Sequence, residues 1–402
     1  MGVSIATTRV LMRETDGTQD ITISGFGTPK AAIFIWTLAY SGNNPRDIAS
    51  MSWGVTDGVT QGAVCCHSNH GVGTTSTDRA SSLTHVAMSL NKSVNCSFNA
   101  WITDGVRINV IGFYEYYLTV VLFGGGDLSA NVHRAIPTTS GHNVTAPGFR
   151  PDLLLTAGIG GTFPQNYSAP AVMSLGMASY NGGSPINRSV SYGSDDNEGT
   201  SDVTVTVRED AYSTQVALGA MQWRAAASDF DSRGYTSTSN ANANNDQILT
   251  LALNFGGVKE VWVGTLDTPT SDGDDAQTGV GFQPNFVLML PSVVTAVDTI
   301  DTTSAGTFGV IAFDGTREYC VTCSDEDGQA TTDTQSWPTD DAVNVPTDAG
   351  ATLLTGTFKS MDTDGWTLNY TDVDQLQAYK WPALAIGEEG PAGAESWTFG
   401  AC

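Results

Sequence analysis

The densest group of metal-ligating side chains in the sequence is a short run of cysteines and histidines. Cys65, Cys66, His67 and His70 lie within six residues, and thiolate and imidazole are ligands that zinc and other transition metals prefer. If this run forms a loop, it could hold a metal ion. A polar loop with two solvated histidines is the simpler interpretation, which we favour because the run occurs only once.

The other candidates for metal binding or nucleophilic catalysis carry a weaker signal. Cys320 and Cys323 have the spacing of half a zinc site, but no second pair follows them, so we expect buried thiols. All five histidines precede residue 143. Since a catalytic triad needs a base beside its nucleophile, histidine cannot be the base of a site repeated along the chain.

Carboxylates are abundant but do not single out a site. With 42 acidic residues, pairs suited to glycoside hydrolysis occur throughout the chain. Three acidic runs, at 194–198, 272–275 and 324–327, contain oxygen ligands for Ca²⁺, although their spacing does not match an EF-hand loop. We expect solvated loops and leave Ca²⁺ binding open. With no phosphate-binding or dinucleotide-binding fingerprint either, the sequence predicts no cofactor and no catalytic residue.

Tryptophan offers one further chemistry, because a flat indole ring can stack on a sugar. Several of the nine tryptophans lie in apolar repeated segments, where core packing explains them. Trp337, beside Pro338 in a polar insert, is the best exposed candidate for a glycan contact. Packing of its own loop is the competing interpretation and the one we favour.

The overall charge excludes some classes of partner. The chain has a net charge of −25 and only 17 lysines and arginines, without the basic cluster that nucleic acid or an anionic membrane surface requires. No run of 18 apolar residues is present, so we expect no membrane insertion. The first residues lack the pattern of a signal peptide, and six sparse cysteines do not suggest a disulfide scaffold.

Four short sequence boxes recur three times in the same order, and they define the elements that position these side chains. The first joins Gly-Phe and a proline to an apolar run, at 25–36, 148–155 and 281–290. The second is an apolar run around a central glycine, ending in Asp-Gly or Asn-Gly, at 51–58, 173–182 and 308–315. The third is a polar turn centred on Gly105, Gly234 and Gly365. The fourth is an apolar strand at 116–122, 247–253 and 381–386.

This repeat predicts an all-β protein of three tandem β-sandwich or jelly-roll modules, each of about 120–130 residues. We place the modules at 1–140 with an N-terminal segment, at 141–270, and at 271–402 with a Gly-rich C-terminal tail. Residues 203–208 alternate as a strand should. The first and fourth boxes are apolar throughout, so we expect them to pair with each other and to be buried on both faces. A linear string and a pseudo-threefold ring both remain open.

The boxes resemble β-sandwich modules of tailed-bacteriophage virion proteins, such as tail fibres and head decoration or spike proteins. The likeness is carried by Gly-Phe-x-Pro-Asp/Asn and its apolar strand, and by the later turn and closing strand, at 148–153, 281–287, 364–368 and 383–386. The first copy departs from it, with Gly27-Thr28 before the proline and Lys30 after it. The resemblance implies an exposed structural module and no catalytic motif.

We therefore expect a non-enzymatic virion protein on the particle surface, in head decoration or in a tail fibre or spike. Assembly in the host cytoplasm, contacts with other virion proteins, a homo-oligomeric state such as a trimer, and attachment to host glycans follow from that resemblance. No nucleic acid partner is expected. The alternative is a β-sandwich lectin or carbohydrate-active enzyme that acts on surface glycans.

Overall fold

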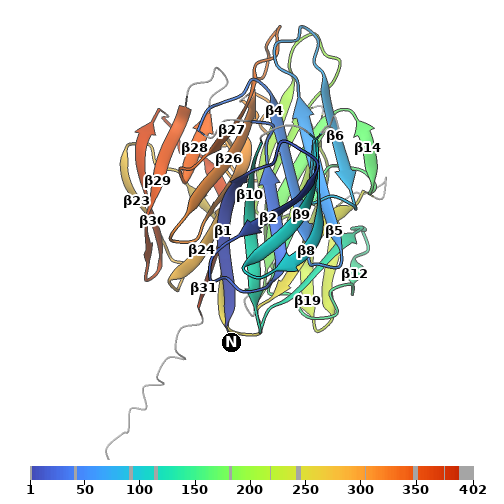
Figure 1. Cartoon of the computed structure of the whole chain (residues 1–402). Coiled ribbons are helices and arrows are strands. Elements are labelled where there is room, and N and C mark those ends of the chain that lie inside the picture. Colours follow the sequence, from blue (N-terminus) through green and yellow to red (C-terminus); the bar gives the residue numbers. More distant parts are fainter. Residues whose placement is uncertain are drawn as a thin grey trace, which may run out of the picture.

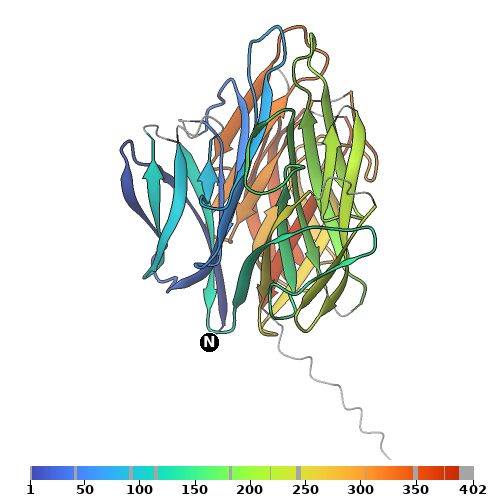
Figure 2. The same cartoon turned by 90° about the vertical axis from the view of Figure 1, so that its right-hand side faces the viewer.

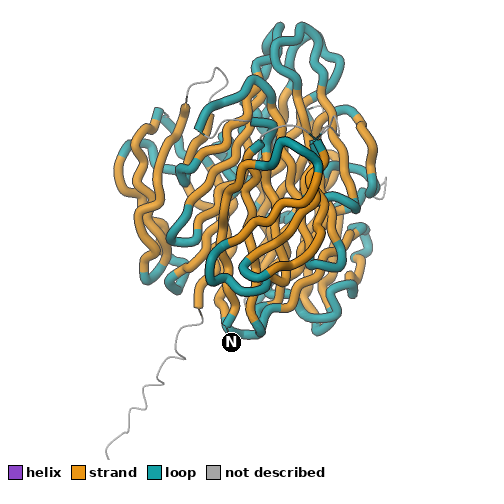
Figure 3. Tube along the Cα trace, viewed as in Figure 1, coloured by secondary structure: helices purple, strands orange, loops and turns teal. Residues whose placement is uncertain are grey.

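The structure is a computed structural model that describes residues 2–388, except 40–42, 90–93, 113–115, 181–182, 218, 241–245, 304, 347–351 and 375. The described part is all-β, with antiparallel sheets and no helix (Figure 3). Cys402 and the Gly-rich tail lie outside the described residues. The predicted fold class is therefore confirmed.

The strands form three sandwiches, numbered here in chain order. The first contains β1 (Val3–Leu11), β2 (Gly17–Thr22), β3 (Pro29–Trp36), β4 (Ala49–Thr56), β5 (Gln61–Ser68), β6 (Thr77–Ser82), β7 (Ala87–Met88), β8 (Asn95–Ile102), β9 (Gly105–Ile111) and β10 (Tyr117–Gly125). The second contains β11 (Ser129–Ala135), β12 (His142–Val144), β13 (Leu153–Gly158), β14 (Gln165–Ser168), β15 (Ala171–Ser179), β16 (Ile186–Ser194), β17 (Val203–Arg208), β18 (Ser213–Ala217), β19 (Ala220–Asp231), β20 (Gly234–Ser239) and β21 (Ile248–Asn254). The third contains β22 (Lys259–Asp267), β23 (Gly273–Thr278), β24 (Pro284–Met289), β25 (Phe308–Phe313), β26 (Glu318–Asp325), β27 (Thr334–Thr339), β28 (Val343–Pro346), β29 (Thr352–Asp362), β30 (Gly365–Val373) and β31 (Lys380–Glu388).

Each sandwich consists of one large and one small sheet with the same strand order. The large sheet of the third sandwich runs β22-β31-β24-β25-β26-β27, and its small sheet runs β23-β30-β29-β28. The strands of the first and fourth boxes are neighbours in all three copies, as β3 with β10, β13 with β21, and β24 with β31. The predicted pairing of the two ends of each module is therefore confirmed.

The chain passes from one sandwich to the next earlier than the sequence boxes suggest. β11 pairs with β21, and β22 pairs with β31, so each of these strands opens a new sandwich. The sandwiches thus span 3–125, 129–254 and 259–388. The boundaries expected at 140 and 270 fall one strand too late, because these opening strands belong to none of the repeated boxes.

The middle strands of the large sheets are buried on both faces, as their apolar composition predicts. In β3, Ile33 and Ile35 belong to a central core, whereas Phe34 and Trp36 belong to the core between the two sheets of their own sandwich. The central core takes side chains from all three sandwiches, including Leu153, Leu155, Phe286 and Leu288. The three large sheets therefore face one another around a shared apolar centre, and the small sheets lie outside (Figures 1 and 2).

The glycines of the third box are required by close backbone packing. A Cβ atom on Gly105, Gly234 or Gly365 would lie within 2 Å of a carbonyl oxygen of the neighbouring strand. The second box is less regular. The glycines at 54 and 176 meet carbonyl oxygens of Val86 and Tyr212 in the same way, but strand pairing places Ile311, not Gly309, at the equivalent position.

The sheets close a ring, because the outer edge of each large sheet is covered by a segment of the next sandwich. β6 pairs with β14 of the second sandwich. β17 is bridged from Val205 to Asp301 of the third, and β27 from Ser336 to Arg46 of the first. The order is cyclic, from the third sandwich back to the first, so the fold is a pseudo-threefold ring and not a linear string. Covered edges also cannot pair with other chains.

Long loops interlock the three sandwiches at one end of the ring, at the top of Figures 1 and 2. Thr75 of the first sandwich exchanges backbone hydrogen bonds with the loop at 197–198 of the second. Ser201 of the second does so with the loop at 328–329 of the third, and Thr332 of the third with the loop at 71–72 of the first. The ends of the large sheets are therefore joined in the same cyclic order as their edges.

Candidate functional site

The structure does not gather the predicted cysteine and histidine ligands. Cys65, Cys66 and His67 lie on strand β5, not in a loop, so their successive side chains point to opposite faces of the sheet, and His70 lies just beyond the strand. Cys66 lies in the central core, whereas Cys65 packs with Met88 on the opposite face. His67 lies 2.9 Å from Asn69 Oδ1, and His70 Nδ1 accepts a hydrogen bond from the Thr334 amide.

The strand period also separates the second cysteine pair. Cys320 lies in the core of the third sandwich and Cys323 in the central core. Burial raises the pKa of the Cys320 thiol to about 12 and raises that of Cys323 well above its ordinary value. Across the described ranges, no group of three or more His, Cys, Asp or Glu side chains is placed to hold a metal ion.

Two of the three acidic runs meet in the interlocked loops, where their carboxylates bind backbone amides. Asp196 accepts a hydrogen bond from the Thr77 amide and Asp327 from the Val203 amide, at 2.9 and 2.8 Å. The third run lies away from them in a small sheet, where Asp274 pairs with Lys359. These contacts give the acidic loops a structural role between sandwiches.

One member of these runs is a buried carboxyl at the point where all three sandwiches meet. Asp325 of β26 accepts hydrogen bonds from Ser194 and Tyr192 of β16, at 2.7 and 2.9 Å, and is fully buried. Burial raises its pKa, an effect that the hydroxyls of Ser194, Ser68 and Tyr192 oppose. Strand pairing makes Ser68, Ser194 and Asp325 equivalent, so each sandwich brings one polar group to this point.

Trp337 lies in strand β27 and is half-buried, so it is not the exposed loop residue that its polar surroundings suggest. Its carbonyl accepts a hydrogen bond from Thr322, and the neighbouring residues Ser336 and Pro338 accept backbone hydrogen bonds from the 43–46 segment of the first sandwich. The indole Nε1 is buried without a hydrogen-bond partner. Its position beside the neighbouring sandwich favours a packing role over a glycan contact.

The recurring Asp-Gly pairs of the second box make tight turns and also join sandwiches. Asp314 Oδ1 accepts hydrogen bonds from two amides of its own turn, and its Oδ2 accepts one from the Thr7 amide of β1 at 2.9 Å. Asp57 repeats this arrangement, with its Oδ2 bound to the Val132 amide of β11 at 2.8 Å. Each aspartate thus caps the exposed edge of the next sandwich's opening strand.

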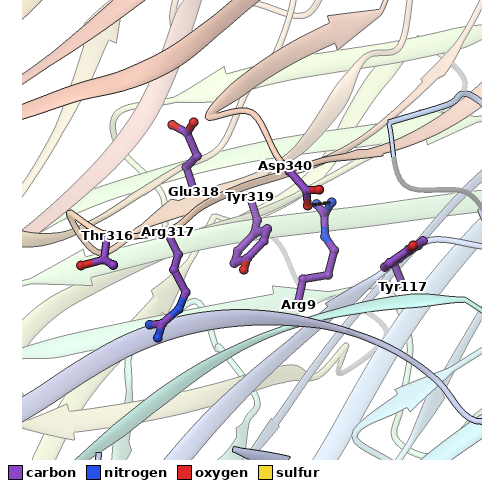
Figure 4. A pocket seen from close by; sticks show the side chains of 7 residues that line it. All are labelled: Arg9, Tyr117, Thr316, Arg317, Glu318, Tyr319 and Asp340. Atoms are coloured by element: carbon purple, nitrogen blue, oxygen red, sulfur yellow. Dashed lines mark hydrogen bonds and ion pairs between the residues drawn. The ribbon is translucent and has the colours of Figure 1, made fainter. Parts of the chain in front are cut away.

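An open groove lies beside the Asp314 turn, at what we call the 3/1 junction, where the third sandwich meets the first (Figure 4). It has a volume of about 530 Å³ and is lined by Arg9, Tyr117, Thr316, Arg317, Glu318, Tyr319 and Asp340. Opening strand β1 contributes Arg9, and the turn and start of β26 contribute residues 316–319. Its position follows from the Asp-Gly turn, which brings β26 against the edge of β1.

Arg9 holds the floor of this groove. Its guanidinium pairs with Asp340 at 2.7 Å and donates hydrogen bonds to the carbonyls of Cys320 and Thr339, with only 3% of the side chain exposed. It also lies over the Tyr319 ring, with Cζ 4.8 Å from the ring centroid. Burial lowers the pKa of Arg9, and the Asp340 carboxylate raises it. Cationic donors shared among a carboxylate and two carbonyls fasten the two sandwiches.

The rim of the groove presents aromatic and polar groups together. Figure 4 places Tyr319 between Arg317 and Arg9, and Tyr117 on the far side of Arg9. Arg317 is 36% exposed and pairs with Asp314. Glu318 accepts a hydrogen bond from the Phe358 amide, and its partial burial raises its pKa. Half-exposed tyrosine rings beside hydrogen-bonding groups suit the recognition of a small polar ligand.

The 1/2 junction, between the first and second sandwiches, has an equivalent but smaller groove of about 250 Å³. Arg134 lies opposite Leu249 on β21, as Arg9 lies opposite Thr119 on β10, so the two arginines occupy equivalent positions. The aligned turns then place Val59, Thr60, Gln61 and Gly62 where the 3/1 junction has Thr316, Arg317, Glu318 and Tyr319. The turn of this second groove therefore has no counterpart of the Tyr319 ring or of the Arg317 guanidinium.

Sequence reasoning missed the groove because its residues come from segments that are far apart and mostly outside the boxes. The one available signal was Thr316-Arg317-Glu318-Tyr319, which follows the Asp-Gly turn of the third copy and differs from the matching residues of the first. A scan of protein-family models finds no match to this chain, and a search of curated proteins finds none either. The described residues include no helix able to span a membrane.

Proposed function

We propose that this chain is a non-enzymatic structural protein on the surface of a tailed-phage virion, in head decoration or in a tail fibre or spike. The observation that carries the proposal is the closed ring, in which a segment of each sandwich covers the outer edge of another sandwich's large sheet. Exposed sheet edges promote aggregation at high local concentration, so covered edges suit a component displayed in many copies.

Charge and thiol chemistry support the same role. A net charge of −25 opposes association between neighbouring copies. The five described cysteines are free and buried, and the central core takes side chains from every sandwich, so the body is held without disulfides. Such a body can assemble in the reducing cytoplasm of a host and persist outside it. Contacts with other virion proteins, and a trimeric state of the whole chain, belong to this proposal.

Mass spectrometry of purified phage particles tests the proposal directly. Detection at hundreds of copies per particle supports a head decoration role, and detection at a few to a few tens supports a tail fibre or spike. Complete absence of the chain from particles, in a preparation where the other virion proteins are detected, would contradict the proposal.

A lectin is the second candidate, and the groove at the 3/1 junction is the observation that favours it. The carboxylates of that groove suit binding better than hydrolysis. Asp340 is paired with Arg9, and Glu318 accepts the Phe358 amide, whereas a glycosidase needs two carboxyl groups free to face one sugar bond. If the protein hydrolyses a surface polysaccharide and Glu318→Gln abolishes that activity, the result would support an enzyme instead.

A further inference from the structure

We infer that the groove at the 3/1 junction is a binding site for a neutral saccharide, with Tyr319 as the stacking surface and Arg317, Thr316 and Asp340 as hydrogen-bonding partners. The inference gives the proposed surface protein its host ligand and rests on that proposed function. It replaces Trp337, which lies half-buried in β27, as the place where the chain contacts a glycan.

The first argument is that stability of the ring does not require the groove's side chains at every junction. The scaffold features recur, since Asp57 and Asp314 both cap the opening strand of the following sandwich. The 1/2 junction nevertheless carries only small or uncharged groups at its turn, with Thr60 and Gly62 at the positions of Arg317 and Tyr319. Arg317 and Tyr319 are therefore additions to a turn that closes the 1/2 junction without them.

The second argument is the way in which the fold fixes the stacking surface. Tyr319 has Arg9 over its ring at 4.8 Å, and Arg9 is itself held by Asp340 and two carbonyls. The ring is therefore positioned before any ligand arrives, so little conformational entropy is lost when a flat apolar sugar face stacks on it. Figure 4 shows Arg317 on the side of the ring away from Arg9.

The third argument concerns the polar partners around that ring. Thr316 is exposed and offers a hydroxyl, Arg317 is 36% exposed, and the Asp340 side chain is 62% exposed while only its Oδ1 binds Arg9. Donors and acceptors thus lie together at the groove, as the alternating hydroxyls of a pyranose require.

The charge balance of the groove selects among saccharides. Its two guanidinium groups are each already paired with a carboxylate, Arg9 with Asp340 and Arg317 with Asp314. The chain as a whole carries a charge of −25, which repels sialylated or uronic-acid-rich polymers. A neutral hexose or N-acetylhexosamine unit avoids that repulsion and uses the same hydrogen bonds.

Saturation-transfer NMR and calorimetry of the full chain test the inference, with neutral oligosaccharides built of glucose, galactose, mannose or N-acetylglucosamine as probes. We expect binding of at least one probe in the micromolar to millimolar range. Arg317→Ala and Tyr319→Ala should each weaken it at least tenfold, whereas Tyr319→Phe, which keeps the ring, should retain it. Thr60 occupies, in the 1/2 groove, the position equivalent to Arg317. Thr60→Ala is therefore the matched control and should leave the binding affinity unchanged.

Because Tyr319→Ala also removes a contact of Arg9, its thermal melting is measured alongside. If that variant is unfolded, the surface substitution Arg317→Ala decides the result. Binding of no probe, or equal binding by Arg317→Ala and the unaltered chain, would overturn the inference, as would tighter binding of polysialic acid or polyuronate. Absence of binding with the chain present in virions refutes the saccharide site alone, whereas binding with the chain absent from virions refutes the virion role.

Discussion

The 3/1 and 1/2 junctions share a scaffold but differ in how they are fastened. The first two sandwiches are joined by the short linker 126–128, and the second and third by 255–258, whereas no linker joins residues 388 and 3. At the junction without a linker, Arg9 is buried and holds three acceptors. At the equivalent position of the linked 1/2 junction, Arg134 is exposed and donates to the Phe163 carbonyl. Of these two equivalent arginines, the buried one with charge-assisted contacts is therefore the one at the junction without a linker.

The largest expected effect separates these two arginines. Arg9→Ala leaves the partly buried carbonyls of Cys320 and Thr339 without their donor and removes an ion pair with the exposed Asp340, so it should lower the free energy of unfolding by about 3–4 kcal/mol. Arg134→Ala should cost less than about 1 kcal/mol, because the side chain is solvated. Urea unfolding of both variants measures the difference, and equal losses would show that the junctions are fastened alike.

The next effect belongs to the 1/2 junction, whose opening strand carries a titratable group. His133 is buried, with Nδ1 2.9 Å from Asn131 Oδ1 and Nε2 3.0 Å from the Tyr235 hydroxyl. The equivalent residue of β1 is Thr8. Burial lowers the pKa of His133 to about 4 from 6.5. Neutral His133 is therefore favoured in the folded state, and its full contribution to stability is present only above pH 6.5.

As the pH falls from 6.5 towards 4, His133 gains a proton in the unfolded chain but remains mostly neutral in the folded chain. This linkage should cost the protein about 3 kcal/mol at pH 4. His133→Gln should remove that part of the acid sensitivity, which unfolding curves at several pH values measure. Thr8→Gln, at the equivalent position of β1, provides the control, since it introduces the same side chain and removes no titratable group. Identical pH profiles for His133→Gln and the unaltered chain would contradict this account.

A smaller and equal effect is expected where the two junctions are alike. Asp57→Ala and Asp314→Ala each leave two turn amides and one amide of the next sandwich without an acceptor. Each should reduce stability by about 2 kcal/mol. Since the two sites lie at different junctions, the double variant should lose the sum. If calorimetry shows clearly different stability losses for Asp57→Ala and Asp314→Ala, the two turns do not contribute equally to the stability of their junctions.

The smallest effect is expected from a circular permutation that adds a linker at the 3/1 junction and opens the linker between the second and third sandwiches. The ends of β10 and β21 run into the next opening strand within five residues, and β31 ends at the equivalent point relative to β1. A permuted chain that joins residue 388 to residue 3 through four residues and opens between Gly256 and Gly257 should keep its stability within about 1 kcal/mol. A large loss would show that the linkers do more than connect.

Much of the fold could be predicted from the sequence, because the repeated boxes report local strand chemistry. Turn glycines and apolar runs gave the strands, and their repetition gave the pairing of first and fourth boxes. The alignment of the third copy was wrong at its central glycine. Gly309 has the same residue type as Gly54 of the first copy, but Ile311 has the same position in the strand register. Type alone cannot distinguish two positions that lie on the same face of a strand, two residues apart.

The candidate site was harder to predict than the fold, because a sequence pattern relates a residue only to its neighbours along the chain. Cys65 and Cys66 are adjacent, yet a strand turns adjacent side chains to opposite faces. Trp337 has polar neighbours, yet those neighbours bind the backbone of the first sandwich. Arg9 and Asp340 are separated by 331 positions, and such a contact follows only from the closed ring.

The junction between the third and first sandwiches, which no linker spans, also sets an order of events during synthesis. The first sandwich emerges from the ribosome before the residues at 314 and 340 that cap and clasp its opening strand. Until the third sandwich has been made, β1 has an uncovered edge and Arg9 has no anion. The contacts of the first strand are therefore made by residues near the other end of the sequence. A nascent chain halted before residue 340 lacks the ion pair between Arg9 and Asp340.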